Sequence, residues 1–239
     1  MLRLGGSILG TENANEFLSA HKGESLEDTI RILSGYADGI ILRHNESGAL
    51  SEAAKVSLVP IINAGDGSGE HPTQALLDLF TIHEKFGGFD GLCIGLAGDV
   101  AHSRTIHSLI YALADYDVEL VFVAPEGLEL PEKYRDYLRD HKTKYSETTN
   151  MESVMPRLNV LYINRPQSER HATKQATTLF PRIDESNVGL LTTDSIIMNP
   201  LPRVGEIAKE IDSNHRSVYF EQARNGLFIR MALLDMLYS

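Results

Sequence analysis

The chain has 239 residues, of which 42% are hydrophobic and 23% are charged. This length allows one large domain or two small ones, and the composition is that of an ordinary globular protein. The formal net charge of −11 argues against a nucleic-acid or anionic-membrane partner, so any anion site must be local. The single cysteine, Cys93, cannot form an internal disulfide, and its apolar surroundings favour a reducing, cytoplasmic compartment.

The N-terminal ten residues mix apolar and glycine residues without the charge or length of a signal peptide. No apolar run reaches the length of a membrane-spanning helix. We therefore expect a cytoplasmic protein with no membrane partner.

Helical and strand patterns alternate along the chain. In the first third, Ser25 and the acidic residues behind it predict a helix that runs to Tyr36. A helix through Ala53 is expected between two short apolar strands, at 39–42 and 59–63.

The same alternation continues from residue 72 to the C-terminus. The expected helices are 72–86, 103–114, an exposed charged helix at 131–141, a short helix at 150–155 and a final helix at 227–237. The expected strands are 91–98, 118–124, 159–164 and 196–199. Apolar strands that alternate with helices predict an α/β fold, with parallel sheet and helices on both faces.

A glycine-rich loop leads into His71-Pro72-Thr73-Gln74 and then into a strongly periodic helix. His71 and Gln74 therefore lie where a helix begins. Unpaired N–H groups and the positive end of the helix dipole suit an anion or a polarised carbonyl oxygen there. Three glycines would let the backbone approach a ligand: Gly65, Gly67 and Gly69. A loop that only caps the helix is the alternative interpretation.

Three arginines each follow an apolar strand, at the carboxyl end where open α/β sheets bind ligands: Arg43, Arg104 and Arg165. Arg104 is the sharpest case, because a cation at a helix start opposes the dipole unless it serves a ligand or a fixed carboxylate. An ion pair with Asp99 is its structural alternative, and each arginine alone fits a structural or surface role. Together they favour a small substrate with several negative groups.

Pro200-Leu201-Pro202 follows a strand and predicts a rigid corner that can aim backbone carbonyls at a ligand amine. A plain stop and turn is the alternative. The nine histidines show no metal-binding spacing, so no metal site is expected. Gly95-x-x-Gly98 is not a dinucleotide fingerprint, and no cofactor is expected.

The string GDG-x-x-x-HPTQ-x-LLDLFTI at residues 65–82 resembles the catalytic chains of aspartate carbamoyltransferases, in the aspartate/ornithine carbamoyltransferase family. The resemblance extends over nearly the entire chain, through Lys22-Gly23-Glu24, Arg43-His44, Arg104-Thr105-x-His107-Ser108-Leu109, Arg165-x-Gln167-x-Glu169-Arg170 and Pro200-Leu201-Pro202-Arg203.

The resemblance implies transfer of the carbamoyl group from carbamoyl phosphate to the amine of L-aspartate, a step of pyrimidine biosynthesis. It assigns carbamoyl phosphate to Arg43, His71 and Gln74, with Arg43 and His71 as the catalytic donors to the oxyanion. It assigns the aspartate carboxylates to Arg104, Arg165 and Gln167, and the substrate amine to the carbonyls of Leu201 and Pro202. Lys22 resembles a mobile-loop lysine that reaches into a neighbouring subunit's site. The family assembles as trimers, and some members bind a separate regulatory chain.

By the same resemblance, we expect two parallel-sheet α/β domains, the first of them incomplete. Residues 1–72 resemble the remainder of a carbamoyl phosphate domain, 73–225 an aspartate domain, and 226–239 a C-terminal helix that returns to the first domain. The family's Ser-x-Arg-Thr-Arg phosphate loop is not in this sequence. Two further departures are Leu18, where the family has serine, and Asn199, where it usually has histidine.

Three hypotheses follow. The chain is a truncated or mis-started aspartate carbamoyltransferase, or a catalytically inactive homologue that acts as a binding or assembly subunit, or a carbamoyltransferase for another amine. Against the third, the Pro200 corner and Arg165-x-Gln167 resemble the aspartate enzymes and not the ornithine enzymes.

Overall fold

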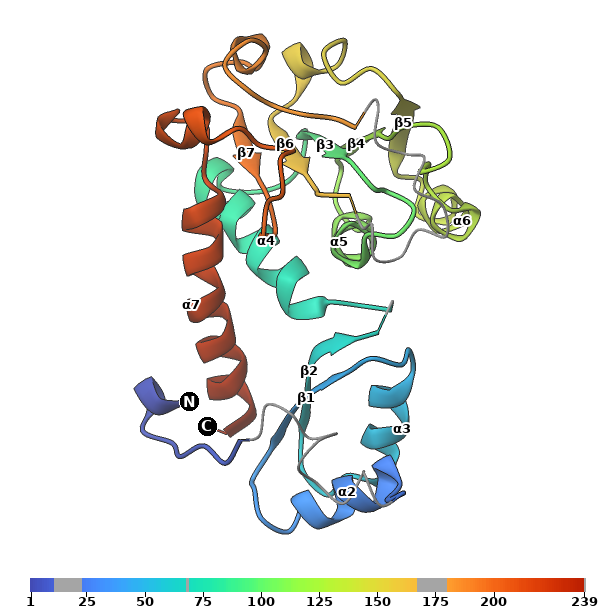
Figure 1. Cartoon of the computed structure of the whole chain (residues 1–239), viewed down its shortest axis with the longest axis vertical. Coiled ribbons are helices and arrows are strands. Elements are labelled where there is room, and N and C mark those ends of the chain that lie inside the picture. The colour runs from blue at the N-terminus through green and yellow to red at the C-terminus, as the bar shows by residue number, and fades with distance from the viewer. Residues whose placement is uncertain (11–22, 68, 167–179, 239) are drawn as a thin grey trace. The chain divides into compact units, whose positions relative to one another are not determined.

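The computed structural model describes residues 1–10, 23–67, 69–166 and 180–238 (Figure 1). The chain forms two compact units, Met1–Thr73 with Leu227–Ser239, and Gln74–Gly226. Both units contain a parallel sheet with helices, two strands in the first unit and five in the second. The α/β class predicted from the sequence is confirmed.

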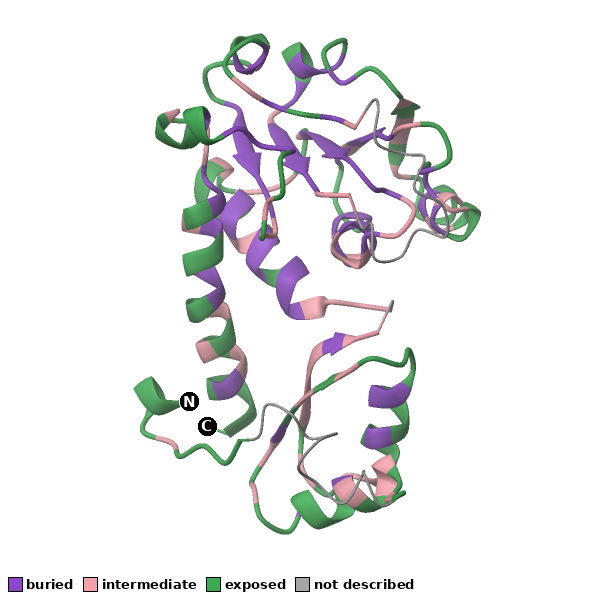
Figure 2. Cartoon of the chain, viewed as in Figure 1, coloured by how far each residue is buried: buried purple, intermediate pink, exposed green. Residues whose placement is uncertain are grey.

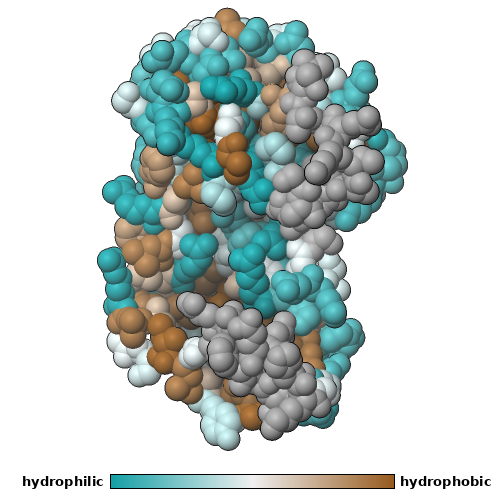
Figure 3. All heavy atoms as spheres, in the orientation of Figure 1, coloured by the Kyte–Doolittle hydropathy of each residue, from teal (hydrophilic) through white to brown (hydrophobic). Residues whose placement is uncertain are grey.

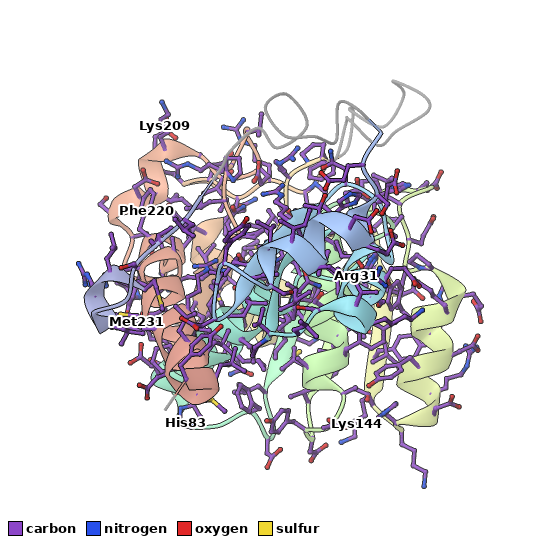
Figure 4. All side chains as sticks on the ribbon, turned by 90° about the horizontal axis from the view of Figure 1, so that it is seen from below. Arg31, His83, Lys144, Lys209, Phe220 and Met231 are labelled. Carbon is purple, nitrogen blue, oxygen red and sulfur yellow. The ribbon has the colours of Figure 1, made fainter. Side chains whose placement is uncertain are left out.

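The first unit is built on strands β1 (Ile40–His44) and β2 (Ile61–Asp66), which pair in parallel. Its helices are α2 (Leu26–Leu33), α3 (Ala49–Val56), the short 3-10 helix η1 (Leu2–Leu4) and the second half of α7 (Tyr219–Tyr238). Helix α2 begins as predicted, because Ser25 Oγ accepts a hydrogen bond from Asp28 N at 3.1 Å. Its last turn carries the exposed Arg31 (Figure 4).

The loops that follow β1 and β2 are tied together. Gly67 N donates to His44 O at 2.8 Å, and Gly48 N donates to both carboxylate oxygens of Asp66. A Cβ on Gly67 would lie 2.5 Å from Asn45 O, so only glycine fits between the two loops. The close approach that the sequence predicts for Gly67 is thus made to its own chain.

The second unit has the strand order β5-β4-β3-β6-β7, all parallel. The strands are β3 (Cys93–Ala97), β4 (Glu119–Val123), β5 (Lys144–Thr148), β6 (Val160–Ile163) and β7 (Ile196–Met198). The helices are α4 (Pro72–Phe86), α5 (Arg104–Leu113), α6 (Glu132–Asp140) and the first part of α7. Short 3-10 helices complete it: η3 (Met155–Arg157), η5 (Val188–Leu190) and η6 (Lys209–Ser213).

Successive strand residues face opposite sides of this sheet and enter separate cores. Leu96, Phe122 and Tyr162 pack in a core with residues of α4, α5 and α6. Their neighbours Ala97, Val123 and Ile163 pack with residues of η3, η5, η6 and the start of α7. Burial on both faces explains why the strands read as continuous apolar runs, and Figure 2 shows the central strands buried throughout.

Three local features differ from the sequence-based expectations. Strand β5 was not expected, because it is polar and charged, as is usual for an edge strand; Lys144 at its start pairs with Asp117 at the surface (Figure 4). The helix expected at 150–155 is wrong: the segment is a turn followed by η3, although Asn150 Oδ1 accepts from Ser153 N in the expected capping manner. The final helix, α7, begins at Tyr219 and not near 227.

The early start of α7 is explained by buried polar side chains, which interrupt an apolar stripe. Gln222 Nε2 donates to Asp78 Oδ1 at 2.6 Å, and Asn225 Nδ2 donates to Thr81 Oγ1 at 3.1 Å. Asp78 is fully buried, and burial raises the pKa of its carboxyl from 3.8 to about 7. Helices α4 and α7 are therefore joined by hydrogen bonds that no hydrophobic pattern reveals.

At the surface, Figure 3 shows hydrophobic side chains gathered at the lower left of the view, in the area of η1 and the C-terminal end of α7. Leu2, Ile8, Leu9 and Met236 are among the exposed apolar residues of the first unit. Within the described residues, no helix is long and apolar enough to cross a membrane. The same residues contain no group of three His, Cys, Asp or Glu side chains that could hold a metal ion.

Gly67→Ala is expected to destabilise the protein by at least ~1 kcal/mol more than Gly48→Ala, because only the first substitution forces a Cβ into neighbouring backbone. Both glycines have positive φ, 51° and 89°, and Gly48 has open space around it, so the pair separates the steric clash from the backbone preference. Urea unfolding followed by circular dichroism measures the two losses, and equal losses would contradict this role of Gly67.

The buried Asp78 should make stability depend on pH. Between about pH 4 and pH 7 the folded protein holds a proton on this carboxyl that the unfolded chain has lost, so the free energy of unfolding falls as pH rises through that window. The total change is on the order of 4 kcal/mol. The amide introduced by Asp78→Asn cannot titrate, so the stability of this variant relative to the parent should rise across the window and level off above it. Urea unfolding of both proteins at a series of pH values tests this, and a pH-independent difference would disprove it.

Candidate active site

Three loops of the second unit emerge at one edge of its sheet. Strands β3, β6 and β7 are parallel neighbours, with Ala97 opposite Ile163 and Tyr162 opposite Met198. The segments that follow them carry the sequence-predicted residues: Arg104 at the start of α5, Arg165 after β6, and Leu201 and Pro202 after β7. Because parallel strands end together, these residues share the carboxyl edge of the sheet, where open α/β sheets bind ligands.

The loop after β3 is pinned to the loop after β6. A Cβ on Gly98 would lie 2.2 Å from Asn164 O, so glycine allows the two strand ends to meet. Asn164 Nδ2 donates to Ser103 Oγ, and Ser103 caps α5 by accepting from Ile106 N at 3.3 Å. These contacts place Arg104, the first residue of α5, beside the segment that carries Arg165.

Both arginines are half-buried at this edge. Arg165 Nη1 donates to the carbonyl of Pro166 at 2.9 Å, which directs the guanidinium along its own loop. Guanidinium groups on two adjacent segments provide planar donors of several hydrogen bonds each, and such donors suit a ligand with more than one carboxylate or phosphate.

His107 lies in the same sequence motif as Arg104, but its side chain packs in the protein interior. It is buried, stacks on Tyr134 at a centroid distance of 4.1 Å, and its Nε2 lies 2.8 Å from Val100 O. Burial lowers the pKa of His107 to about 4, which keeps the imidazole neutral at physiological pH. The motif therefore combines a histidine of the hydrophobic core with an arginine at the carboxyl end of the sheet.

The corner after β7 has an unusual backbone. Leu201 has φ 52°, and the Leu201–Pro202 peptide bond is cis. Leucine rarely adopts positive φ, and such residues tend to persist at functional sites. Leu201 N donates to Asn199 Oδ1 at 2.7 Å, which fixes the turn immediately after the strand.

Arg203 holds the far end of this corner. Both of its terminal nitrogens donate to the carboxylate of Asp212, and the guanidinium lies over the rings of Tyr219 and Phe220, at 5.4 Å and 5.7 Å. Phe220 is labelled in Figure 4. The hydrogen bonds from Arg203 lower the pKa of Asp212 to about 2. The corner is thus held at both ends, by Asn199 and by Asp212.

Gln74 lies in the first turn of α4, where the sequence places it, and its side chain is buried. Its Nε2 donates to Asp78 Oδ1 at 2.9 Å. His71 is half-buried and directly precedes α4. Arg43 is exposed on β1, where the register with β2 shifts between Leu42 and His44. Such an irregularity redirects a side chain at the end of a strand.

Lys22 and Gln167, the other two predicted site residues, lie outside the described residues. The sequence did not predict three residues that hold the site residues or their loops by hydrogen bonds: Asp78, Gln222 and Asn164. A signal existed only for Asp78, as an acidic residue within an apolar helical run.

Known proteins match nearly the whole chain. Residues 1–84 match the family described as aspartate/ornithine carbamoyltransferase, carbamoyl-P binding domain, and residues 90–237 match its Asp/Orn binding domain. The chloroplastic aspartate carbamoyltransferase of Arabidopsis thaliana is 47% identical over 99% of this chain and 62% of its own length. The aspartate carbamoyltransferase catalytic subunit of Thermococcus gammatolerans is also 47% identical, over 99% of this chain and 77% of its own.

A solved structure agrees with these relatives. Aspartate transcarbamoylase from Trypanosoma cruzi, in complex with carbamoyl aspartate and phosphate, superposes with a TM-score of 0.92 at 40% identity, over 98% of this chain and 76% of that one. The chain thus spans 62% of the Arabidopsis relative's length and 76% of the Trypanosoma structure. Matches of this identity and coverage establish that the chain belongs to the aspartate/ornithine carbamoyltransferase family.

Proposed function

We propose that this protein transfers the carbamoyl group from carbamoyl phosphate to the amine of L-aspartate, in pyrimidine biosynthesis. The observation that carries the proposal is the carboxyl end of the sheet in the second unit, where Arg104 at the start of α5 and Arg165 after β6 lie on segments that neighbour the corner at Leu201. Two arginines suit the two carboxylates of aspartate, and backbone carbonyls suit its amine. The names of the relatives support the same reaction.

The proposed roles follow this chemistry. Arg104, Arg165 and Gln167 hold the aspartate carboxylates, and the carbonyls of Leu201 and Pro202 receive the amine hydrogens. The amine nitrogen attacks the carbamoyl carbon; a C–N bond forms, the C–O bond to phosphate breaks, and the amine loses a proton as phosphate leaves. No covalent enzyme intermediate is required.

The carbamoyl phosphate side is assigned to Arg43, His71 and Gln74. Arg43 and His71 are the catalytic donors to the oxygen that becomes negative in the tetrahedral intermediate. His71 can serve as a neutral donor if its tautomer places a proton on the nitrogen that faces this oxygen. Arg43 and His71 belong to the first unit, and Gln74 lies in the first turn of α4.

The family resemblance also implies an assembly, and the composition of the chain implies a location. We propose a homotrimer in which Lys22 completes a neighbouring subunit's site, with a separate regulatory chain as a further partner, in the cytoplasm. The buried Cys93, whose pKa is raised by burial, is consistent with a reducing compartment. Several plant relatives are named as chloroplastic, so finding a tagged chain in a plastid would contradict the cytoplasmic location.

The first prediction from this function concerns turnover. The purified chain should form carbamoyl aspartate from carbamoyl phosphate and L-aspartate, and Arg104→Ala or Arg165→Ala should raise the KM for aspartate by about 10- to 100-fold. This follows from the loss of a charge-assisted contact of roughly 1.5–3 kcal/mol. Arg139→Ala is the matched control, because this exposed arginine pairs with acidic residues of its own helix, α6.

Three outcomes decide the alternatives. Equal kinetics for the Arg104, Arg165 and Arg139 variants would overturn the proposed aspartate contacts. Turnover with L-ornithine in place of L-aspartate would favour a carbamoyltransferase for another amine. A folded chain that shows no turnover would favour the inactive binding or assembly subunit.

Assembly is tested separately by size-exclusion chromatography with light scattering. A mass three times that of the single chain is expected, and it should not change in the Lys22→Ala variant if the lysine acts on substrate only. A monomer at all accessible concentrations would contradict the trimer and the cross-subunit role of Lys22.

A further inference from the structure

Two segments that the proposed reaction uses are joined by a buried path of hydrogen bonds. The path begins at Gln74, whose Nε2 donates to Asp78 Oδ1 at 2.9 Å. The same carboxylate oxygen accepts from Gln222 Nε2 at 2.6 Å. Helix α4 and the first turn of α7 therefore share one acceptor.

The path continues from α7 to the corner after β7. Gln222 Oε1 accepts from Asn199 N at 2.9 Å, and Asn199 Oδ1 accepts from Leu201 N at 2.7 Å. The four side chains are almost completely buried, with exposed fractions of 8% for Gln74, 0% for Asp78, and 1% each for Gln222 and Asn199. In such an environment each of these bonds is costly to break, because a buried donor or acceptor would be left without a partner.

Asn199 also reaches the arginine loop. Its Nδ2 donates to Ile163 O and to Glu206 Oε1, both at 2.8 Å, and Ile163 ends the strand that leads to Arg165. One amide thus holds the corner with its oxygen and the end of β6 with its nitrogen. A side chain with only acceptors or only donors cannot make both connections.

The backbone of Leu201 depends on this support. A leucine with φ 52° has left the common regions of backbone conformation, and it stays there only while its surroundings hold it. Its N–H bond to Asn199 holds the peptide group that precedes Leu201, and the Leu201 carbonyl is the next group along the backbone. Small displacements of positioning groups are enough to slow a reaction that depends on orientation.

We propose that Asp78 and Asn199 are positioning residues. They act through Gln222 to hold the side chain of Gln74 and the carbonyl of Leu201 at a defined position relative to each other. The inference rests on the proposed function for the substrate roles of Gln74 and Leu201. The hydrogen-bonded path itself stands on the geometry alone.

The path predicts different kinetic effects for substitutions of Asn199 and of Asp78. Asn199→Ala removes the acceptor of Leu201 N and should raise the KM for aspartate about tenfold or more, with a smaller effect on carbamoyl phosphate. Asp78→Leu removes the acceptor shared by both segments and should raise the KM for both substrates. Asp78→Asn should keep both KM values near those of the parent. The hydrogen bonds from Gln74 and Gln222 both fall on Oδ1, and the side-chain oxygen of an asparagine can accept both.

Thr81→Val is the matched control. Thr81 is fully buried on α4, and its hydroxyl accepts from Asn225 of α7, so the variant removes a buried bond between the same helices that does not lead to the corner. It should lower stability and leave both KM values unchanged. If Asp78→Leu or Asn199→Ala, folded, behaves like Thr81→Val, the residues are structural and the proposal is overturned.

A measurement independent of turnover is amide hydrogen exchange. The N–H groups of Asn199 and Leu201 should exchange at least about tenfold faster in Asp78→Leu and Asn199→Ala, and at the parental rate in Thr81→Val and Asp78→Asn. A parent chain without turnover would count against the proposed function, and the exchange rates would still decide the path. Unchanged exchange at both amides in every variant would overturn the path itself.

Discussion

The second unit depends on the parallel pairing of strands that are buried on both faces. Parallel strands end at the same edge, so the loops after β3, β6 and β7 have no other place to emerge. The two cores on either side of the sheet fix its register to within one residue, since a slip would exchange the sets of side chains that face each core. Hydrophobic packing thereby determines where the polar site residues lie, although none of them takes part in it.

A second constraint is that polar groups taken out of water need partners. Gln74, Asp78, Gln222 and Asn199 are buried together, and each is paired with another or with backbone. The bonds that satisfy burial also determine distance and angle, which apolar contacts do only loosely. The buried polar residues therefore hold the site segments at defined distances, whereas the apolar residues fill the remaining volume of the interior.

Much of the fold was predictable because the buried strands are apolar runs bounded by glycine and polar residues. What failed were elements whose pattern is masked by their surroundings. Edge strand β5 is charged because one side of it has no partner strand. The first two turns of α7 contain polar residues, Gln222 and Asn225, that are buried against α4 rather than exposed to water.

By itself, the sequence determined the α/β class, the apolar strands near which Arg43, Arg104 and Arg165 lie, and the family resemblance through the HPTQ and PLP motifs. These are local properties of composition, spacing and motif. Only the tertiary structure decided that Asp78 serves Gln74 and Gln222 at once, and that Asn199 supports both Leu201 and the strand before Arg165. Hydrogen bonds between residues far apart in the chain leave no periodic trace in it, because either partner alone reads as an ordinary polar residue.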